Sequence, residues 1–352
     1  MLRAFFGTDN CLKTTAPAVN TIFADWWTSS GIPGIAGGLR LSNACIDQDG
    51  WLCGLSTSLE SQITIDLTGL FAPAAKKITI GFRFKTLVKA AGNYQFLSLA
   101  PASAPRTTTD YLSTTGSAWM ANAAVNAELY IEATYTRATG LITYLVNGVA
   151  ATESRSLTLS AGGIAAWDAG TLAMNFRLSG IGSAATARYG IRDIVVIDDV
   201  VGDGITGPIG AMRIYPIQAV SAAGEGWVPS SGSSSLVDVL NTPVPATAVI
   251  LTSPSDKKPI TVGLNATMPA KSRIFAVAPT LSAASMAIAP TPTSVQVSAG
   301  GTSLPAKTLS IKSGGVSWSN PIGMYRTAPD GTDWTTAKLA TLAVKITPDT
   351  AA

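Results

Sequence analysis

The sequence contains no histidine among its 352 residues, and this absence excludes several kinds of active site. Histidine changes charge near neutral pH, is a frequent zinc ligand and serves as the base of serine and cysteine triads. Charged residues make up only 13%, and 24 Lys+Arg nearly balance 21 Asp+Glu. A formal net charge of +3 is not the basic footprint of a nucleic-acid-binding protein. We therefore expect no histidine-dependent catalysis and no nucleic-acid partner.

Cysteine is also scarce, with Cys11, Cys45 and Cys53 as the only three. An odd number argues against a complete disulfide framework, and no CxxC spacing typical of a metal site occurs. Cys45 and Cys53 could pair across the loop between them. Buried thiols are the favoured interpretation, because no secretory signal precedes the cysteines and folding in a reducing cytoplasm is expected.

Long apolar runs are missing, although apolar residues make up 47% of the chain and the mean hydropathy is +0.31. Even the stretch 194–201 is interrupted by Asp198 and Asp199, so we expect no membrane insertion. High hydrophobicity with low net charge excludes a disordered chain. The length predicts about two domains, each with its own core.

Short alternating stretches between turn signals predict an all-β protein. In the stretch 78–84, Ile78, Ile80, Phe82 and Phe84 alternate with polar or small residues, so one face of this strand is expected to be core. Strands are predicted at 62–67, 78–84, 94–99, 128–136, 141–146, 172–178, 193–197 and 211–215, and then at 246–251, 259–268, 272–278, 295–297, 308–311, 321–326 and 342–346.

A stretch rich in Gly, Pro and Ser interrupts the strand pattern after Tyr215. It predicts a first domain at 1–216, a linker at 217–245 and a second domain at 246–352. The pair Asn147-Gly148 predicts a tight hairpin turn. One short helix is predicted at 333–339, where Asp333 is a suitable N-cap.

The first domain contains several segments that together resemble the concanavalin A-like lectin, or laminin-G-like, jelly roll. These segments are 37–41, 78–84, 129–149 and 191–196. The resemblance covers roughly 1–216. It implies an all-β fold in which a concanavalin A-like jelly-roll sandwich precedes a second, smaller β-sandwich domain.

Further segments resemble a set of tailed-bacteriophage virion proteins that join a lectin-like sandwich to a small β-sandwich. They are 207–216, 226–233, 236–238, 334–337 and 344–346. The resemblance implies a structural protein of the tail, collar or capsid exterior. Other phage virion proteins would then be its partners, and it would be assembled in the host cytoplasm and located in the virion.

Two carboxylates, Glu128 and Glu132, invite a comparison with jelly-roll glucanases, which carry paired carboxylates on one strand. At about 3.3 Å per residue, their α-carbons would be roughly 13 Å apart. Productive carboxylate pairs lie about 5–9.5 Å apart. Tyr130 also occupies the place between them where a third acid would be expected. We expect both glutamates at a solvent-facing strand edge and no enzymatic activity.

Aspartates gather in two places, and calcium binding is the alternative to consider because calcium takes several loop oxygens. Aspartate before glycine is also typical of turns, where its side chain bonds the local backbone. The turn interpretation is favoured, and no metal or other cofactor is expected. The aspartates concerned are Asp47, Asp49, Asp193, Asp198, Asp199 and Asp203.

Tryptophans are the candidates for an interface or for stacking on a sugar ring. Packing in the core is the favoured role, followed by a protein interface and then a glycan site. If the Trp26-Trp27 pair is extended, one ring points inward and the other toward a partner. The candidate side chains are Trp26, Trp27, Trp51, Trp119 and Trp167.

These observations together predict a non-enzymatic virion protein whose chemistry is association. Burial of apolar and aromatic surface would join copies of the chain to one another, as a trimer or higher ring, and to neighbouring virion proteins. An adhesin that binds host surface glycan through the first domain is the alternative. A glycoside hydrolase is less favoured.

Overall fold

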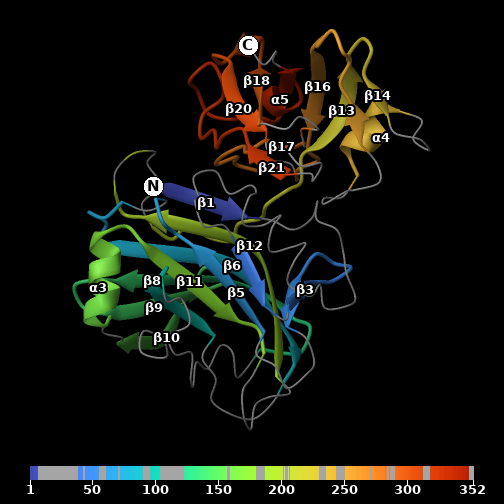
Figure 1. Ribbon diagram of the computed structural model, residues 1–352. Helices are drawn as coiled ribbons and strands as arrows, with labels where there is room; N and C mark the ends of the chain where they lie inside the picture. Colours follow the sequence, from blue (N-terminus) through green and yellow to red (C-terminus); the bar gives the residue numbers. More distant parts are fainter. Residues whose placement is uncertain are drawn as a thin grey trace. The chain divides into compact units, whose positions relative to one another are not determined.

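The computed structural model describes most of the chain, in segments separated by short and long gaps. The described residues are 1–6, 39–42, 44–54, 61–69, 72–89, 96–103, 123–156, 159–179, 187–200, 202, 205, 207–229, 235–242, 250–269, 272–283, 285, 290–311 and 318–348. Contacts divide these residues into two compact units, 1–214 and 215–348, and each unit is described by itself (Figure 1).

The first unit is a jelly-roll sandwich of two antiparallel sheets, as the sequence predicted. The larger sheet has eight strands in the order β10-β9-β8-β6-β12-β4-β3, with β1 paired to β12. Its strands are β1 (Leu2–Phe6), β3 (Ala44–Ile46), β4 (Leu52–Gly54), β6 (Lys77–Val88), β8 (Glu128–Thr136), β9 (Leu141–Val146), β10 (Val149–Ser156) and β12 (Arg188–Asp198).

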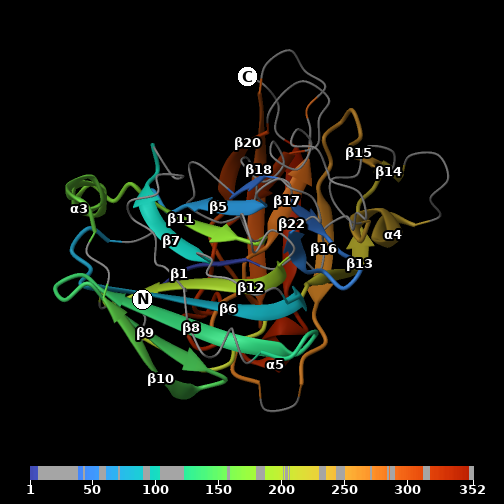
Figure 2. The same cartoon turned by 90° about the horizontal axis from the view of Figure 1, so that it is seen from below.

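The smaller sheet of the first unit has four strands in the order β2-β5-β11-β7. Its strands are β2 (Leu39–Ser42), β5 (Gln62–Asp66), β7 (Leu97–Pro101) and β11 (Leu172–Arg177). Figure 2 shows β5, β7 and β11 in one layer and β6, β8 and β12 in the other. The two faces of the larger sheet therefore differ, since only one of them meets the smaller sheet.

Aromatic rings fill the space between the two sheets. Phe82 contacts Phe176 edge to face, with ring centroids 5.1 Å apart, and Phe84 contacts Phe96 in the same manner at 5.2 Å. Tyr189 stacks on Phe84 at 5.5 Å. The expected inward alternation along β6 is confirmed, because the side chains of Phe82 and Phe84 are at most 1% exposed.

The predicted hairpin turn is confirmed between β9 and β10. Asn147 and Gly148 have φ angles of 50° and 80°, so both adopt the left-handed conformation that a tight turn requires. The Asn147 side chain also accepts a hydrogen bond from the backbone N–H of Tyr130 at 2.8 Å. The turn is thereby attached to the neighbouring strand β8.

A helix that the sequence did not predict, α3 (Ala161–Asp168), packs against β7 and β11. Two glycines and three alanines in eight residues give no clear apolar stripe. Its start is defined by Ser160, whose hydroxyl accepts a hydrogen bond from the N–H of Gly163 at 3.0 Å. Its inner side carries Trp167, which is fully buried.

The strand predicted at 211–215 is wrong, because residues 207–217 form no strand. The apolar alternation that suggested a strand is present, but the backbone of this segment bonds to side chains of the larger sheet instead of to another strand. The predicted strand at 272–278 also fails, since only Ile274 and Val277 form isolated bridges there.

The second unit is a small β-sandwich built on a six-stranded antiparallel sheet, with the order β13-β16-β22-β18-β19 and β20 paired to β18. Two short ribbons, β14-β15 and β17-β21, complete it. The strands are β13 (Gln218–Ala223), β14 (Val228–Pro229), β15 (Leu251–Thr252), β16 (Ile260–Asn265), β17 (Thr280–Ala283), β18 (Thr291–Ala299), β19 (Thr302–Ser303), β20 (Lys307–Ile311), β21 (Trp318–Pro321) and β22 (Ala343–Pro348).

The stretch 217–245 is not a linker, because its described residues carry β13, β14 and the helix α4 (Leu236–Leu240). β13 pairs with β16 and so belongs to the six-stranded sheet. The glycines that suggested a linker, Gly224 and Gly226, follow β13 and lie between it and β14. The predicted C-terminal helix is confirmed as α5 (Thr336–Leu339), but its N-cap is Thr335 and not Asp333.

The core of the second unit lies over one face of its large sheet. Val262, Val295, Val297 and Val344 are at most 4% exposed and pack together with Trp334. The indole N–H of Trp334 donates to the carbonyl oxygen of Tyr325 at 2.9 Å. Among the described residues of both units, no helix combines the length and apolar character needed to cross a membrane.

Candidate functional site

The outer face of the eight-stranded sheet, which points away from the smaller sheet, carries a group of charged side chains. Because side chains alternate along a strand, the residues of β6 between the buried phenylalanines point outward. The strand register then places the outward residues of β8 and β12 beside them. We call these residues the outer-face cluster: Arg83, Glu128, Glu132, Arg192 and Asp193.

Ion pairs connect the three strands of the outer-face cluster. Arg83 binds the Glu128 carboxylate through Nη1 and the Asp193 carboxylate through Nε, the latter at 3.1 Å. Arg192 Nη2 lies 3.0 Å from the other oxygen of Glu128. Both carboxylate oxygens of Glu128 are therefore held by arginines.

Trp51 lies beneath one end of the outer-face cluster. The Arg192 guanidinium lies 4.4 Å from the centroid of its ring, and Lys85 Nζ lies 5.4 Å from it. Arg192 Nη1 also donates to the carbonyl oxygen of Asp49 at 3.2 Å. Arg192 is thus fixed by a cation–π contact, an ion pair and a backbone acceptor.

Asp193 reaches the cluster because β12 is irregular at this point. The pairing of β12 with β6 shifts register between Arg192 and Val195, and Asp193 has a φ of 52°. Aspartate adopts this left-handed conformation more readily than most side chains. The irregularity allows the consecutive residues Arg192 and Asp193 both to join the cluster.

Glu132 is buried, which corrects the expectation of a solvent-facing position, since it is 1% exposed. Residues 207–213, which we call the covering segment, lie over it. Its Oε1 accepts from the N–H of Ile209 at 2.7 Å and its Oε2 from the N–H of Gly210 at 3.2 Å. Arg83 Nε donates to the carbonyl oxygen of Met212 at 3.2 Å. The covering segment is thus attached to the sheet at two places.

Burial shifts the ionisation of two groups beneath the covering segment. It raises the pKa of the Glu132 carboxyl, while the N–H groups of Ile209 and Gly210 partly oppose that rise. Burial, reinforced by the charge of Glu132, also raises the pKa of the Tyr130 hydroxyl. These shifts arise from the removal of water by the covering segment and the neighbouring strands.

The two glutamates have separate bonding environments. Glu128 lies between two arginines, whereas Glu132 accepts two backbone N–H groups. Each therefore acts as a hydrogen-bond acceptor within the chain. The ion pairs of Glu128 hold neighbouring strands together, and the hydrogen bonds of Glu132 hold the covering segment on the sheet.

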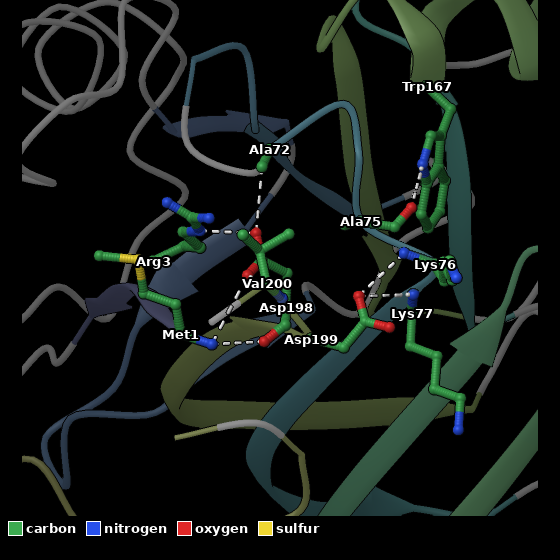
Figure 3. A network of polar contacts seen from close by, with 10 residues as sticks. All are labelled: Met1, Arg3, Ala72, Ala75, Lys76, Lys77, Trp167, Asp198, Asp199 and Val200. Atoms are coloured by element: carbon green, nitrogen blue, oxygen red, sulfur yellow. Dashed lines mark hydrogen bonds and ion pairs between the residues drawn. The ribbon is translucent and has the colours of Figure 1, made fainter. Parts of the chain in front are cut away.

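Asp198, one of the candidate calcium ligands, instead binds nitrogen donors of the chain (Figure 3). Its side chain is fully buried. Arg3 Nε lies 2.6 Å from Oδ2, which also accepts from the N–H of Ala72 at 3.0 Å. Oδ1 lies 3.5 Å from the Met1 ammonium and accepts from the N–H of Val200 at 3.2 Å. This carboxylate joins β1, β12 and the turn before β6.

Asp199 fastens the same turn from its other side. Its Oδ1 accepts from the N–H groups of Lys76 and Lys77 at 2.8 and 3.1 Å. The indole of Trp167 donates to the carbonyl oxygen of Ala75 at 3.0 Å, as Figure 3 also shows. The turn is therefore held by Asp199 and by helix α3.

The turn interpretation is also confirmed for Asp47, whose Oδ1 accepts from the N–H groups of Asp49 and Trp51 at 2.9 and 2.8 Å. Asp203 lies outside the described residues. Within the part of the chain that the structure describes, no group of three or more metal-ligating acidic or cysteine side chains occurs.

The tryptophan candidates divide into two groups. Trp51 and Trp167 are 2% and 0% exposed, as the packing interpretation expected. Trp26, Trp27 and Trp119 lie outside the described residues, so their predicted roles stay predictions.

Sequence reasoning identified the two glutamates but missed the arginines beside them. Arg83 alternates with phenylalanines on β6, and this pattern was sufficient to place it on the polar face. Its partners lie on other strands, and the Ile209 and Gly210 amides are 77 and 78 positions from Glu132. No local pattern in the sequence indicates that pairing.

No protein-family model and no curated protein matches the chain. Among solved structures, the chain is similar to lectin II from Ulex europaeus, with 12% identity, a TM-score of 0.31 and coverage of 46% of this chain and 92% of that one. The Lotus tetragonolobus seed lectin is 11% identical with a TM-score of 0.31, and the match covers 50% of this chain and 98% of the lectin. A sialidase is 14% identical with a TM-score of 0.30, and the match covers 52% of this chain but only 19% of the sialidase. The architecture of the first unit is read from its own topology, in which an eight-stranded and a four-stranded antiparallel sheet form the two layers of a sandwich.

Proposed function

We propose that the protein is a non-enzymatic structural component of a tailed-bacteriophage virion, in its tail, collar or capsid exterior. The proposal rests on the bonding partners of the outer-face cluster, which belong to the chain itself. Its arginines and carboxylates bind one another and the covering segment. Side chains that could act on a substrate instead stiffen the jelly-roll unit, which suits a rigid body in an assembly.

Exposed apolar side chains offer the surface for association. In the second unit, Val220 on β13, Val228 on β14 and Ile250 beside β15 are 58%, 59% and 50% exposed. Burying such side chains between copies of the chain, or against another virion protein, would stabilise the assembly. Closed rotational symmetry would repeat each contact, in a trimer or a higher ring.

The first experiment is to locate the chain and measure its oligomeric state. Mass spectrometry of purified mature particles should detect the chain, and light scattering of the purified protein should give a trimer or a higher ring. Val220→Asp and Val228→Asp should shift the protein toward monomer. Val149→Asp, at a valine of the first unit that is 69% exposed, is the matched control and should leave the oligomer unchanged. Absence of the chain from mature particles would refute the proposal.

Binding of a host surface glycan is the second candidate function. It is favoured by the polar groups beside Trp51, where the one-third-exposed Glu128 carboxylate lies near the cations of Arg192 and Lys85. Carboxylates and ammonium groups can bond sugar hydroxyls. A glycan array with the full chain tests this candidate. Binding that Glu128→Gln abolishes and Glu225→Gln leaves intact would establish a glycan site in the first unit.

A further inference from the structure

Two of the three cysteines lie directly opposite each other in a hairpin of the first unit. β3 and β4 pair with Ala44 opposite Gly54, Cys45 opposite Cys53 and Ile46 opposite Leu52. The connecting turn begins at Asp47. β3 is the terminal strand of the eight-stranded sheet, so among the described residues this hairpin lies at an open edge.

The type of pairing sets the distance between the two backbones. The N–H of Asp47 donates to the carbonyl oxygen of Trp51 at 2.9 Å, which marks a hydrogen-bonded position. Such positions alternate along an antiparallel ladder, so Cys45 and Cys53 occupy the next one. The α-carbons of a hydrogen-bonded pair are about 5.5 Å apart, and disulfides most often span about 5.5–6 Å.

The β-carbons must move closer together before a bond can form. Directly opposite β-carbons are about 4.5–5.5 Å apart, against about 3.5–4.5 Å in a disulfide. A hydrogen-bonded pair lies toward the wide end of the first range, so closing a bond would bring the strands together by about 1–2 Å at this position. The terminal strand β3 can make this movement because β4 is its only partner in the described part of the sheet.

The Cys53 thiol is placed beside the turn. It is 4% exposed, and its Sγ lies 3.4 Å from Oδ2 of Asp47. The other carboxylate oxygen of Asp47 holds the N–H of Trp51. Cys53 also packs with Trp51 in a small apolar cluster. The thiol, the turn and the ring beneath Arg192 are therefore in contact.

We propose that Cys45 and Cys53 form a disulfide when the protein meets an oxidising small disulfide such as oxidised glutathione. One cysteine thiolate attacks the glutathione disulfide and releases one glutathione thiolate, which leaves a mixed disulfide. The second cysteine thiolate then attacks the protein sulfur of that mixed disulfide and releases the other glutathione thiolate. The protein loses two electrons and two thiol protons, and one glutathione disulfide becomes two glutathione thiols.

The bond would act on the outer-face cluster through the turn. Asp49 supplies a carbonyl acceptor to Arg192, and Trp51 supplies the ring on which Arg192 stacks. Both residues lie between the two cysteines in the sequence. Oxidation would hold this turn in place when the protein leaves a reducing compartment. The bond depends only on the hairpin, so it would form in a virion component and in a glycan-binding protein alike.

The test uses the full-length folded chain, incubated with oxidised glutathione, then unfolded in denaturant and treated with iodoacetamide so that every remaining thiol is accessible. The expected result is loss of two of the three thiols, a mass lower by two hydrogen atoms and a peptide in which Cys45 is linked to Cys53. The oxidised chain should also unfold at a higher temperature than the reduced chain.

Single-cysteine variants provide the controls. Cys11→Ser should behave as the unchanged chain does, whereas Cys45→Ser should give no linked peptide and no rise in unfolding temperature on oxidation. Circular dichroism checks that each variant folds, and the measurement on the unchanged chain needs no variant. Three alkylated thiols, a link to Cys11, or glutathione adducts alone would each overturn the proposal.

Discussion

At the scale of the residue, Asp198 and Glu132 are two buried carboxylates that bind different donors. Asp198 has a guanidinium and an ammonium group within 3.5 Å in addition to two backbone N–H groups, whereas Glu132 has backbone N–H groups alone. A buried carboxylate needs such partners because leaving it unpaired costs several kcal/mol. The two residues therefore respond differently to substitution and to pH.

Asp198→Ala should destabilise the first unit strongly. Removing one member of a buried ion pair leaves its partner uncompensated and costs about 3 kcal/mol or more. Urea unfolding monitored by circular dichroism measures this loss. The matched control is Asp168→Ala, because Asp168 pairs with Arg137 at a side-chain exposure of 54%. Exposed pairs are worth less than about 1 kcal/mol, so equal losses in the two variants would contradict the assigned role of Asp198.

Glu132 should give the first unit a stability that falls as the pH rises. Because burial raises the pKa of this carboxyl, the folded state holds its proton at pH values where the unfolded chain has released it. The resulting stabilisation is complete below about pH 4.5, the ordinary value, and is lost as the pH rises through the raised value. Glu132→Gln cannot ionise and lacks this dependence.

The measurement is the difference in unfolding free energy between the unchanged chain and Glu132→Gln, taken at several pH values from 4.5 to 7. We expect the advantage of the unchanged chain to decrease across this range. Thr134→Ala, a non-ionising change on the same strand, should give a difference independent of pH. An advantage that stays constant or grows with pH would show that Glu132 does not titrate as expected.

At the scale of the element, β6 and β8 approach closely where glycine leaves room. A β-carbon on Gly81 would lie 2.3 Å from the Tyr130 hydroxyl and 2.6 Å from Val195 Cγ2. Tyr130 is opposite Arg83 in the register and is 2% exposed, so its ring cannot turn out to solvent. The absence of a side chain at Gly81 therefore permits Tyr130 to pack on the outer face.

Gly81→Ala should cost about 1–3 kcal/mol through overpacking. Adding Tyr130→Phe removes the nearest atom and should recover part of this loss, with a coupling energy of about 0.5–3 kcal/mol in a double-mutant cycle. Gly162→Ala in α3 is the control, since its β-carbon would meet only Ser160 Oγ at 3.7 Å. That change should be neutral or stabilising by up to about 1 kcal/mol, because alanine favours a helix. A coupling energy of zero would rule out the contact between Gly81 and Tyr130.

At the scale of the whole molecule, the covering segment decides where the first unit ends. Residues 207–213 precede the division at 214, and their bonds to Glu132 and Arg83 lie within the first unit. A fragment 1–214 should therefore fold with the stability of the first unit. A fragment 1–206 loses the donors to Glu132 and should be less stable by about 1–3 kcal/mol. Thermal and urea unfolding of the two fragments make the comparison, and equal stabilities would show that the covering segment contributes little.

The all-β class and many of the strand positions of the first unit could be predicted from local sequence. The alternation of Ile78, Ile80, Phe82 and Phe84 marked a buried strand face, because side chains of a strand point to opposite sides in turn. The pair Asn147-Gly148 marked a hairpin, since both residues tolerate positive φ. These features depend on neighbours in the chain, and the structure confirmed them.

The predictions that failed concern residues whose surroundings come from distant parts of the chain. Glu132 was expected at a solvent-facing edge, and 211–215 was expected as a strand. The stretch 217–245 was expected as a linker, although β13 pairs with β16. Each error arose because burial or pairing was assigned without knowledge of the partner segment.

The β-rich character of the chain, its turns and the absence of histidine chemistry follow from period, turn propensity and composition, because these are local properties of the sequence. The tertiary structure decided what the charged groups do. Burial and pairing depend on which segments meet, and Glu132 meets backbone donors 77 and 78 positions away while Asp198 meets Arg3 across 195 positions. Only the folded chain brings these groups within bonding distance, and the strength of an ionic contact depends on that distance and on the exclusion of water.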